Sequence, residues 1–263
     1  MFQGYIKVLI VLGLLGIGGA AFCLKGWHKD LETALPVKAT PPVSVAVAAA
    51  PTRKAPVVQA PSNTPQTLTH IEEGKHYQRI PAKISQDPRI QGFIAQDPGK
   101  VQVIEFFSYG CYGCQQLHPS LNQWLTTKPN NVVFYRMPVV FHPGWDQLAK
   151  IFYATQALGL SKKLDTEFFT AINQNHVDLS KDAILEDFVK VRGVDPKTFM
   201  DALHSFSVNR QYTRDQDLSN LYQIILSPVV VVNTPTGSFL ASVPMVGNTE
   251  NFIKVLNHII SMK

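Results

Sequence analysis

Three patterns of apolar and polar residues follow one another along the chain. Residues 8–24 form an uncharged, almost wholly apolar run between Lys7 and Lys25. Residues 34–68 are rich in Pro, Ala, Val and Thr and show no helical or strand period, a composition that favours extended conformers over a packed core. The rest of the chain shows regular patterns. We therefore predict an N-terminal hydrophobic segment with a basic flank within residues 1–30, a disordered Pro/Ala-rich linker over residues 31–68 and a folded domain over residues 69–263.

Runs of β-branched and aromatic residues predict the strands of the folded domain. The expected strands are residues 76–80, 101–108, 131–140, 229–232 and 238–242. Pro138 cannot donate a backbone hydrogen bond, so we expect the third strand to lie near a sheet edge or to end there. Residues 233–237, Asn-Thr-Pro-Thr-Gly, predict the turn of a hairpin between the last two strands.

Apolar residues at helical spacing predict a block of helices between the third and fourth strands. The expected helices are residues 115–127 before this block, 145–158, 165–174, 181–191, 196–206 and 209–226 within it, and 249–262 at the end. Pro119 is expected to kink the first helix, Asp195-Pro196 to start one, and Thr249 to cap the last. Residues 81–100, with three prolines, are expected to be irregular. The order of elements is that of an α/β protein.

The net charge of +5 gives no indication of an acidic partner for the folded domain. Residues 1–68 contain six Lys or Arg against two Asp or Glu, which accounts for +4 of the total. The remaining 195 residues therefore carry only +1. Without a basic stripe interleaved with aromatic residues, nucleic-acid binding is disfavoured.

Cys111 and Cys114 are the candidate reactive pair, because they lie between a predicted buried strand and a predicted helix. Tyr109-Gly110 forms the expected turn, so Cys111 falls at the helix N-terminus, where free N–H groups and the helix dipole stabilise a thiolate. A thiolate is the nucleophile of disulfide exchange. Cys114, three residues later on the same helical face, is positioned as the resolving cysteine.

Two other interpretations of the pair remain open at this stage. A Cys-x-x-Cys motif can be half of a zinc site, and His118 and His142 are the candidates to complete it. The pair can also form a purely structural disulfide, although closing so short a loop removes little entropy from the unfolded chain. Beyond this pair, the sequence contains no phosphate-binding loop or ordered Ser/His/Asp set that stands out.

From about residue 69 to residue 263 the chain resembles the DsbA family of thioredoxin-fold thiol:disulfide oxidoreductases. The resemblance rests on four separated motifs: E-G-K-H-Y at residues 73–77, E-F-F-S-x-x-C-x-x-C at 105–114, A-x-x-A-L-G-L at 154–160 and S-P-V-V-V-V-N at 227–233. It implies an α/β thioredoxin fold with an inserted helical domain. The expected core comprises residues 69–142 and 219–263, and the expected insertion comprises residues 143–218.

The resemblance also implies roles for individual residues. Cys111 matches the surface nucleophile and Cys114 the buried resolving thiol, and their redox-active disulfide takes the place of any cofactor. Pro228 matches the cis-proline that faces the disulfide, and Glu105 matches a buried acid of the family. A carboxylate within Val-Ile-Glu-Phe-Phe should be desolvated, with a raised pKa, and able to take the proton of Cys114. The alternative for Glu105 is an edge-strand acid that points to water.

Three candidate substrate-binding residues depart from the better-known family members. Those members carry Pro-His between the cysteines, whereas this chain has Tyr112-Gly113, which supplies no positive charge. Ser227 replaces a more common Val or Thr, and its hydroxyl is placed to hydrogen-bond the Cys111 sulfur. We predict that the pKa of Cys111 is lowered, but less than in a Pro-His enzyme, so that the disulfide is a weaker oxidant.

The N-terminal apolar run predicts export. Its length lies at the short limit for a membrane-spanning helix and at the long limit for a signal-peptide core. No polar segment follows Gly19-Ala20-Ala21, which favours an uncleaved anchor over a cleaved signal peptide. Cys23 raises the alternative of lipid modification, against which the large Phe22 argues.

Together these features predict a periplasmic thiol:disulfide interchange protein held at the inner membrane. We expect a dithiol oxidase whose partners are unfolded or partly folded exported proteins that contain cysteines. The resemblance implies a second partner, a membrane quinone-linked protein that re-oxidises it. A disulfide isomerase or reductase of the same fold is the alternative, and a non-catalytic binding module or holdase is a further one.

Overall fold

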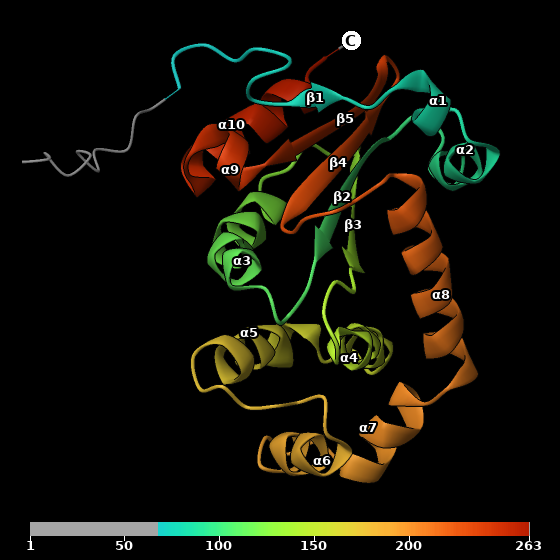
Figure 1. Cartoon of the computed structure of the whole chain (residues 1–263), viewed down its shortest axis with the longest axis vertical. Helices are drawn as coiled ribbons and strands as arrows, with labels where there is room; N and C mark the ends of the chain where they lie inside the picture. Colours follow the sequence, from blue (N-terminus) through green and yellow to red (C-terminus); the bar gives the residue numbers. More distant parts are fainter. Residues whose placement is uncertain (1–67, 263) are drawn as a thin grey trace, which may run out of the picture. The chain divides into compact units, whose positions relative to one another are not determined.

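The computed structural model describes residues 68–262, which form a mixed sheet flanked by helices (Figure 1). The predicted hydrophobic segment, the predicted linker up to residue 67 and Cys23 lie outside the described residues. Within residues 68–262, none of the helices has the length and apolar character needed to cross a membrane.

The sheet has five strands in the order β1-β5-β4-β2-β3. They are β1 (Gln78–Arg79), β2 (Val101–Phe107), β3 (Val132–Pro138), β4 (Val229–Thr234) and β5 (Gly237–Ser242). β2 runs parallel to β3 and antiparallel to β4, and every one of its residues is buried. β3 lies at the edge and ends at Pro138, as the sequence predicts.

Helices cover both faces of the sheet. The described helices are α1 (Ala82–Ser85), α2 (Pro88–Ile94), α3 (Tyr112–Leu125), α4 (Trp145–Ala157), α5 (Ser161–Asn173), α6 (Asp182–Lys190), α7 (Pro196–Leu203), α8 (Phe206–Leu221), α9 (Val243–Val246) and α10 (Thr249–Ile260). α3 and α10 pack on the face that carries Val103, while α2 and the end of α8 pack on the face that carries Ile104. Because side chains alternate along a strand, Glu105 points to the same face as Val103, toward α3.

The helical insertion has its own core at the end of the sheet where β2 leads into α3 (Figure 1). Phenylalanines from α4 to α7, such as Phe152, Phe168 and Phe199, are fully buried there beside Phe107 of β2. α8 belongs to both parts, since Val208 packs in this core and Leu218 packs beneath the sheet. The predicted domain boundary at residue 219 therefore falls inside α8.

Several local predictions were wrong. The segment 81–100 contains α1 and α2 and is not irregular. α2 begins with Asp87 as its N-cap, which accepts a hydrogen bond from the backbone N–H of Arg89, and Pro88 follows. This is the same start signal as at Asp195-Pro196, where the prediction is confirmed.

Three other boundaries also differ from the expectation. Asn248, one residue before Thr249, caps α10 and accepts from the backbone N–H of Asn251. The hairpin turn is shorter than predicted, because β4 continues to Thr234 and β5 starts at Gly237. α8 starts at Phe206, immediately after its N-cap Ser205, and not at residue 209.

Candidate active site

Cys111 is the N-cap residue of α3, at the end of the turn that connects β2 to this helix. Its backbone is extended, and its sulfur accepts a hydrogen bond from the backbone N–H of Cys114 at 3.2 Å. A cap residue accepts from the first turn of its helix, so the sulfur occupies the position at which negative charge is best stabilised. Cys114 lies one turn below and is fully buried. Both are free thiols in the structure.

The pKa values of the two thiols are shifted in opposite directions. The pKa of Cys111 is lowered to about 6, chiefly because the Cys114 side chain hydrogen-bonds to its sulfur, with help from Ser227 and from backbone N–H groups. The pKa of Cys114 is raised strongly, first by burial and then by its interaction with Cys111 and the nearby Glu105 charge. At neutral pH, Cys111 is therefore the thiolate and Cys114 the protonated thiol.

The Ser227–Pro228 loop faces the Cys111 sulfur. The peptide bond between these residues is cis, and the Ser227 carbonyl oxygen lies 3.5 Å from the Cys111 sulfur, as acceptor for the protonated thiol. The Ser227 side chain also contributes to the lowered pKa of Cys111. Gly113 lies against this loop, since a Cβ atom there would stand 3.2 Å from Cδ of Pro228.

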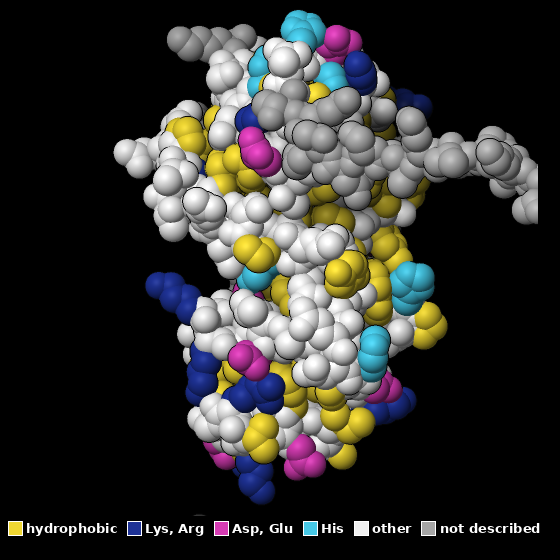
Figure 2. Space-filling model, turned by 90° about the vertical axis from the view of Figure 1, so that its left-hand side faces the viewer, with side chains coloured by type: hydrophobic (Ala, Val, Ile, Leu, Met, Phe, Trp, Pro, Cys, Tyr) yellow, Lys and Arg dark blue, Asp and Glu magenta, His cyan; other side chains and the backbone are white. Residues whose placement is uncertain are grey.

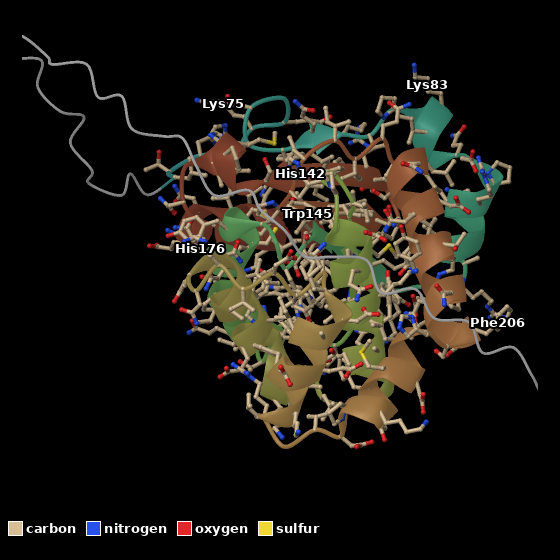
Figure 3. All side chains as sticks on the ribbon, turned by 60° about the horizontal axis from the view of Figure 1, so that its bottom comes forward. Lys75, Lys83, His142, Trp145, His176 and Phe206 are labelled. Atoms are coloured by element: carbon tan, nitrogen blue, oxygen red, sulfur yellow. The ribbon has the colours of Figure 1, made fainter. Side chains whose placement is uncertain are left out.

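Exposed apolar side chains surround the cysteines. Tyr112, at the first position of α3, is 58% exposed, and Ile225 and Leu226 are exposed just before Ser227. Trp145 lies so close to Gly110 that a Cβ atom there would be 2.5 Å from the indole Nε1. Figure 3 shows His142 next to Trp145, and their ring centroids are 4.7 Å apart. The Cys111 sulfur therefore lies beside a rim of apolar side chains.

Glu105 is buried beneath this site, with its side chain 1% exposed. Its Oε2 atom accepts a hydrogen bond from Nε of Arg136 at 2.7 Å, whereas its Oε1 atom has no hydrogen-bond partner. Burial raises its pKa, and the Arg136 charge opposes that rise. An acid on an edge strand that points to water is thus excluded, because β2 lies between β3 and β4.

The sequence did not indicate that Arg136, Asp165 and Tyr109 lie around Glu105. Arg136 is aligned with Glu105 in the β2–β3 register, and its Nη1 donates to Asp165 at 2.9 Å. The Tyr109 hydroxyl donates to the other oxygen of Asp165 at 2.5 Å. The only signal in the sequence is an arginine among the mostly apolar residues of the predicted strand 131–140.

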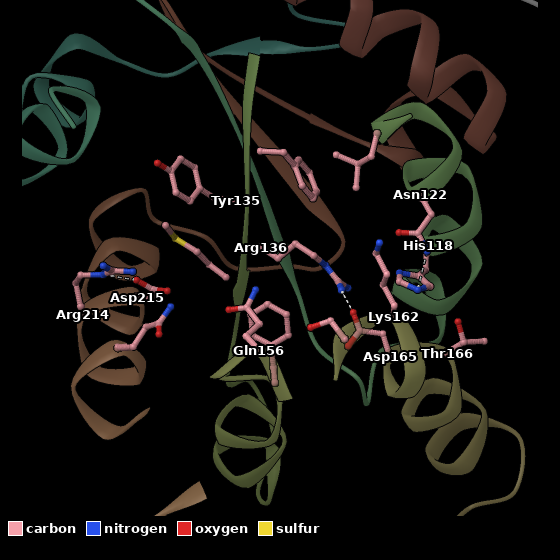
Figure 4. A pocket seen from close by; sticks show the side chains of 16 residues that line it. His118, Asn122, Tyr135, Arg136, Gln156, Lys162, Asp165, Thr166, Arg214 and Asp215 are labelled. Atoms are coloured by element: carbon pink, nitrogen blue, oxygen red, sulfur yellow. Dashed lines mark hydrogen bonds and ion pairs between the residues drawn. The ribbon is translucent and has the colours of Figure 1, made fainter. Parts of the chain in front are cut away.

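His118 and His142 do not join the cysteines in a metal site. His118 is buried, hydrogen-bonds Asn122 at 3.0 Å and packs on Phe169, and burial lowers its pKa to about 4. His118 and Asn122 line a cavity with a volume of about 530 Å³. Figure 4 shows both side chains among those that line it. Among residues 68–262, no three His, Cys, Asp or Glu side chains are grouped closely enough to hold a metal ion.

Comparisons with known proteins give a consistent result, although no family model matches the chain. It is 32% identical over 193 residues to the thiol:disulfide interchange protein DsbA of Azotobacter vinelandii, across 73% of this chain and 85% of that one. It is 40% identical over 139 residues to the protein of the same name from Burkholderia cepacia, across 53% and 66%. The crystal structure of Pseudomonas aeruginosa DsbA superposes with a TM-score of 0.62 at 26% identity, across 72% of this chain and 93% of that chain.

Proposed function

The chain belongs to the DsbA family of thiol:disulfide oxidoreductases, and we propose that it acts as an exported dithiol oxidase through the Cys111-Tyr112-Gly113-Cys114 motif. The observation that carries this proposal is the position of Cys111 as the N-cap of α3, with its pKa lowered to about 6. With that pKa, roughly nine-tenths of the Cys111 sulfur is thiolate at pH 7. A stabilised thiolate favours the reduced enzyme, so the disulfide form is a better oxidant.

The oxidase reaction proceeds by two thiol–disulfide exchanges. A client thiolate attacks Cys111 of the Cys111–Cys114 disulfide, which forms a mixed disulfide and releases Cys114 as leaving group. Glu105, whose pKa burial raises, is the buried acid beneath the site that would deliver a proton to the Cys114 sulfur, and the raised pKa of Cys114 favours the neutral thiol. A second client thiolate then attacks the client sulfur, forms the client disulfide and releases Cys111 as thiolate. The client is oxidised by two electrons and the enzyme is reduced.

A dithiol oxidase needs two partners, a client and a protein that re-oxidises it, and we propose both together with a location. The clients are cysteine-containing exported proteins in unfolded or partly folded form, which fits the apolar side chains Tyr112, Ile225 and Leu226 around the sulfur. The reduced enzyme requires re-oxidation, for which we propose a membrane quinone-linked partner.

The apolar run at residues 8–24 supports export and attachment to the inner membrane on its periplasmic side. Recovery of the full chain in the membrane fraction, and its release on deletion of residues 1–30, would test the attachment.

The redox potential tests the direction of electron flow. Equilibration of the full chain with reduced and oxidised glutathione should give a potential clearly above that of thioredoxin, about −270 mV. A value near −270 mV would overturn the oxidase assignment. It would favour a reductase or isomerase, the alternative supported by the absence of an imidazole between Cys111 and Cys114.

Client capture tests whether the protein exchanges disulfides at all. The Cys114→Ser variant retains the nucleophile and lacks the resolving thiol, so mixed disulfides with periplasmic proteins should accumulate and disappear on reduction. The Cys111→Ser variant is the control and should trap little. Equal recovery of partners with both variants, resistant to reduction, would favour a non-catalytic binding module.

A further inference from the structure

A buried carboxylate from the helical insertion shares one guanidinium with Glu105. Arg136 donates from Nε to Glu105 at 2.7 Å and from Nη1 to Asp165 at 2.9 Å. Its side chain and that of Asp165 are each 10% exposed, so both interactions lie away from bulk water. Figure 4 shows Arg136 extending across the cavity wall to Asp165, on the helix α5.

Asp165 is also tied to the turn that precedes Cys111. Its Oδ1 atom accepts the hydroxyl hydrogen of Tyr109, whose ring is fully buried in the insertion core. Asn173, at the other end of α5, donates to the backbone oxygen of Tyr109 at 2.8 Å. One helix of the insertion therefore contacts the active-site turn twice, and only one of these contacts involves a charged group.

The charge balance around Glu105 depends on this sharing. The groups that face it are Arg136 from β3, Asp165 from α5, Tyr109 from the turn and Cys114 from α3, with neutral His118 farther along α3. Arg136 is the single cation among them and serves two carboxylates. Its charge is therefore divided between them. The Oε1 atom of Glu105 and the Nη2 atom of Arg136 both lack a hydrogen-bond partner, so the pairing of Glu105 with the guanidinium is incomplete. A carboxylate that is only partly compensated in a buried site is a stronger base than a fully paired one.

We propose that Asp165 is a positioning residue that keeps Glu105 basic enough to exchange a proton with Cys114, by competing with it for Arg136. The inference rests on the proposed function, because it concerns the proton of the resolving thiol. When Cys114 attacks a mixed disulfide on Cys111, the Cys111–Cys114 bond forms, the client thiolate leaves, and the Cys114 proton moves to Glu105. Two carboxylates on one guanidinium titrate as a coupled pair.

The test separates this step from the first exchange. The reduced full chain is mixed with excess peptide disulfide and quenched in acid at intervals. Mass spectrometry then counts the mixed disulfide and the internal disulfide, and the resolution rate is measured from pH 3 to pH 8. In Asp165→Asn, Glu105 gains an undivided Arg136, so its pKa falls and it becomes a weaker base. We expect resolution about threefold faster at the acid end of the profile and slower on the neutral plateau.

Two control variants distinguish this effect from loss of structure. Asp165→Glu retains the charge and should restore the wild-type profile. Asn173→Ala removes the uncharged contact with Tyr109. This variant should change the resolution rate by the same factor at every pH, so that the inflection of the pH profile stays at the wild-type pH. An Asp165→Asn profile lowered by one factor at every pH, as in Asn173→Ala, would overturn the inference. A wild-type protein that forms no mixed disulfide would instead overturn the proposed function.

A measurement on the wild-type chain avoids dependence on the folding of the Asn variant. The carboxyl carbon of Glu105, labelled with ¹³C and identified by its loss in Glu105→Gln, is followed by NMR across the same pH range. Coupling to Asp165 predicts two inflections in its chemical shift, one from each carboxyl group. A single inflection would contradict the sharing of Arg136.

Discussion

The lowered pKa of Cys111 depends on its place on the backbone more than on charged neighbours. Neither residue between the cysteines carries a positive charge, yet the pKa of Cys111 is lowered to about 6. The stabilising donors are the Cys114 thiol, Ser227 and backbone N–H groups of the first turn of α3. The strand–turn–helix context thus lowers the pKa of Cys111 without an imidazole between the two cysteines.

The lowered pKa of Cys111 should make the stability of the reduced protein depend on pH. An unfolded cysteine has a pKa near 8.5, so stabilisation by the folded thiolate is complete above that pH and is lost as the pH falls to about 6. Urea unfolding of the reduced protein should show a free-energy difference from Cys111→Ser that grows between pH 6 and 9. It should stay below about 4 kcal/mol, because the half-buried sulfur is partly screened. A constant difference would contradict the lowered pKa.

Gly110 should be needed for the position of Trp145. In Gly110→Ala the new Cβ atom would overlap the indole at 2.5 Å, so Trp145 has to move. We expect a loss of about 1–3 kcal/mol in unfolding free energy and a change in tryptophan fluorescence. The control is Gly92→Ala in α2, where nothing lies within 4 Å and the helix should gain about 0.5–1 kcal/mol. Unchanged fluorescence in Gly110→Ala would refute the contact.

The sequence predicted the burial of Glu105 but not its partners. Burial follows from its neighbours Val103, Ile104, Phe106 and Phe107, which are visible in the chain itself. The partner Arg136 depends on the register between β2 and β3, and Asp165 comes from an element folded separately. Contacts of this kind join residues far apart in sequence, and no local pattern specifies them.

Among the elements, those with strong periodic patterns were predicted well, whereas short ones and boundaries were not. β2 and the helices of the insertion were expected where they occur, because buried strands and amphipathic helices leave clear patterns, although α5 starts four residues before its expected limit and α8 ends five residues before its own. α1 and α2 are too short to show a period, and Pro81 and Pro88 were interpreted as breakers. Yet proline is compatible with the first turn of a helix, as Asp87-Pro88 shows.

The cap of α10 gives a direct test of one corrected boundary. Asn248→Ala removes the acceptor of the Asn251 N–H, so unfolding free energy should fall by about 1 kcal/mol. Thr249→Ala, at the first helical position, serves as the matched variant and should change it by less than about 0.5 kcal/mol. Urea denaturation at neutral pH measures both. An equal or larger loss of unfolding free energy in Thr249→Ala would indicate that Thr249, as predicted from the sequence, is the N-cap.

At the scale of the whole folded region, the proposed active site lies where the sheet meets the core of the helical insertion. Phe107 and Tyr109 lead from the sheet into the insertion core, and Cys114 packs in that same core. Figure 2 shows Lys, Arg, Asp and Glu side chains on the upper and lower parts of one face, with mostly hydrophobic and histidine side chains among the coloured ones at its middle. The fold class could be predicted because the spacing of apolar residues indicates the order of strands and helices along the chain. The interdomain contacts could not, because they arise only when both parts are packed.

Arg136 should be among the most costly single residues to remove. It pairs with two buried carboxylates and lies 3.9 Å from the centroid of the Phe107 ring, so it links β3, β2 and α5. In Arg136→Met both carboxylates lose their cation while remaining buried, which should reduce the unfolding free energy by about 3–5 kcal/mol at neutral pH.

Acid should relieve part of this loss. Without the guanidinium, the folded pKa values of Glu105 and Asp165 rise further above those of the unfolded chain, so the penalty for ionising them is largest at high pH. As the pH falls through the raised pKa values, the carboxylates are protonated and the difference from wild type should shrink. Lys254→Met, which breaks an exposed pair with Glu250, is the control and should cost less than about 1 kcal/mol. A loss in Arg136→Met that is equally large at pH 4 and pH 8 would show that packing on Phe107, not charge, makes this residue important.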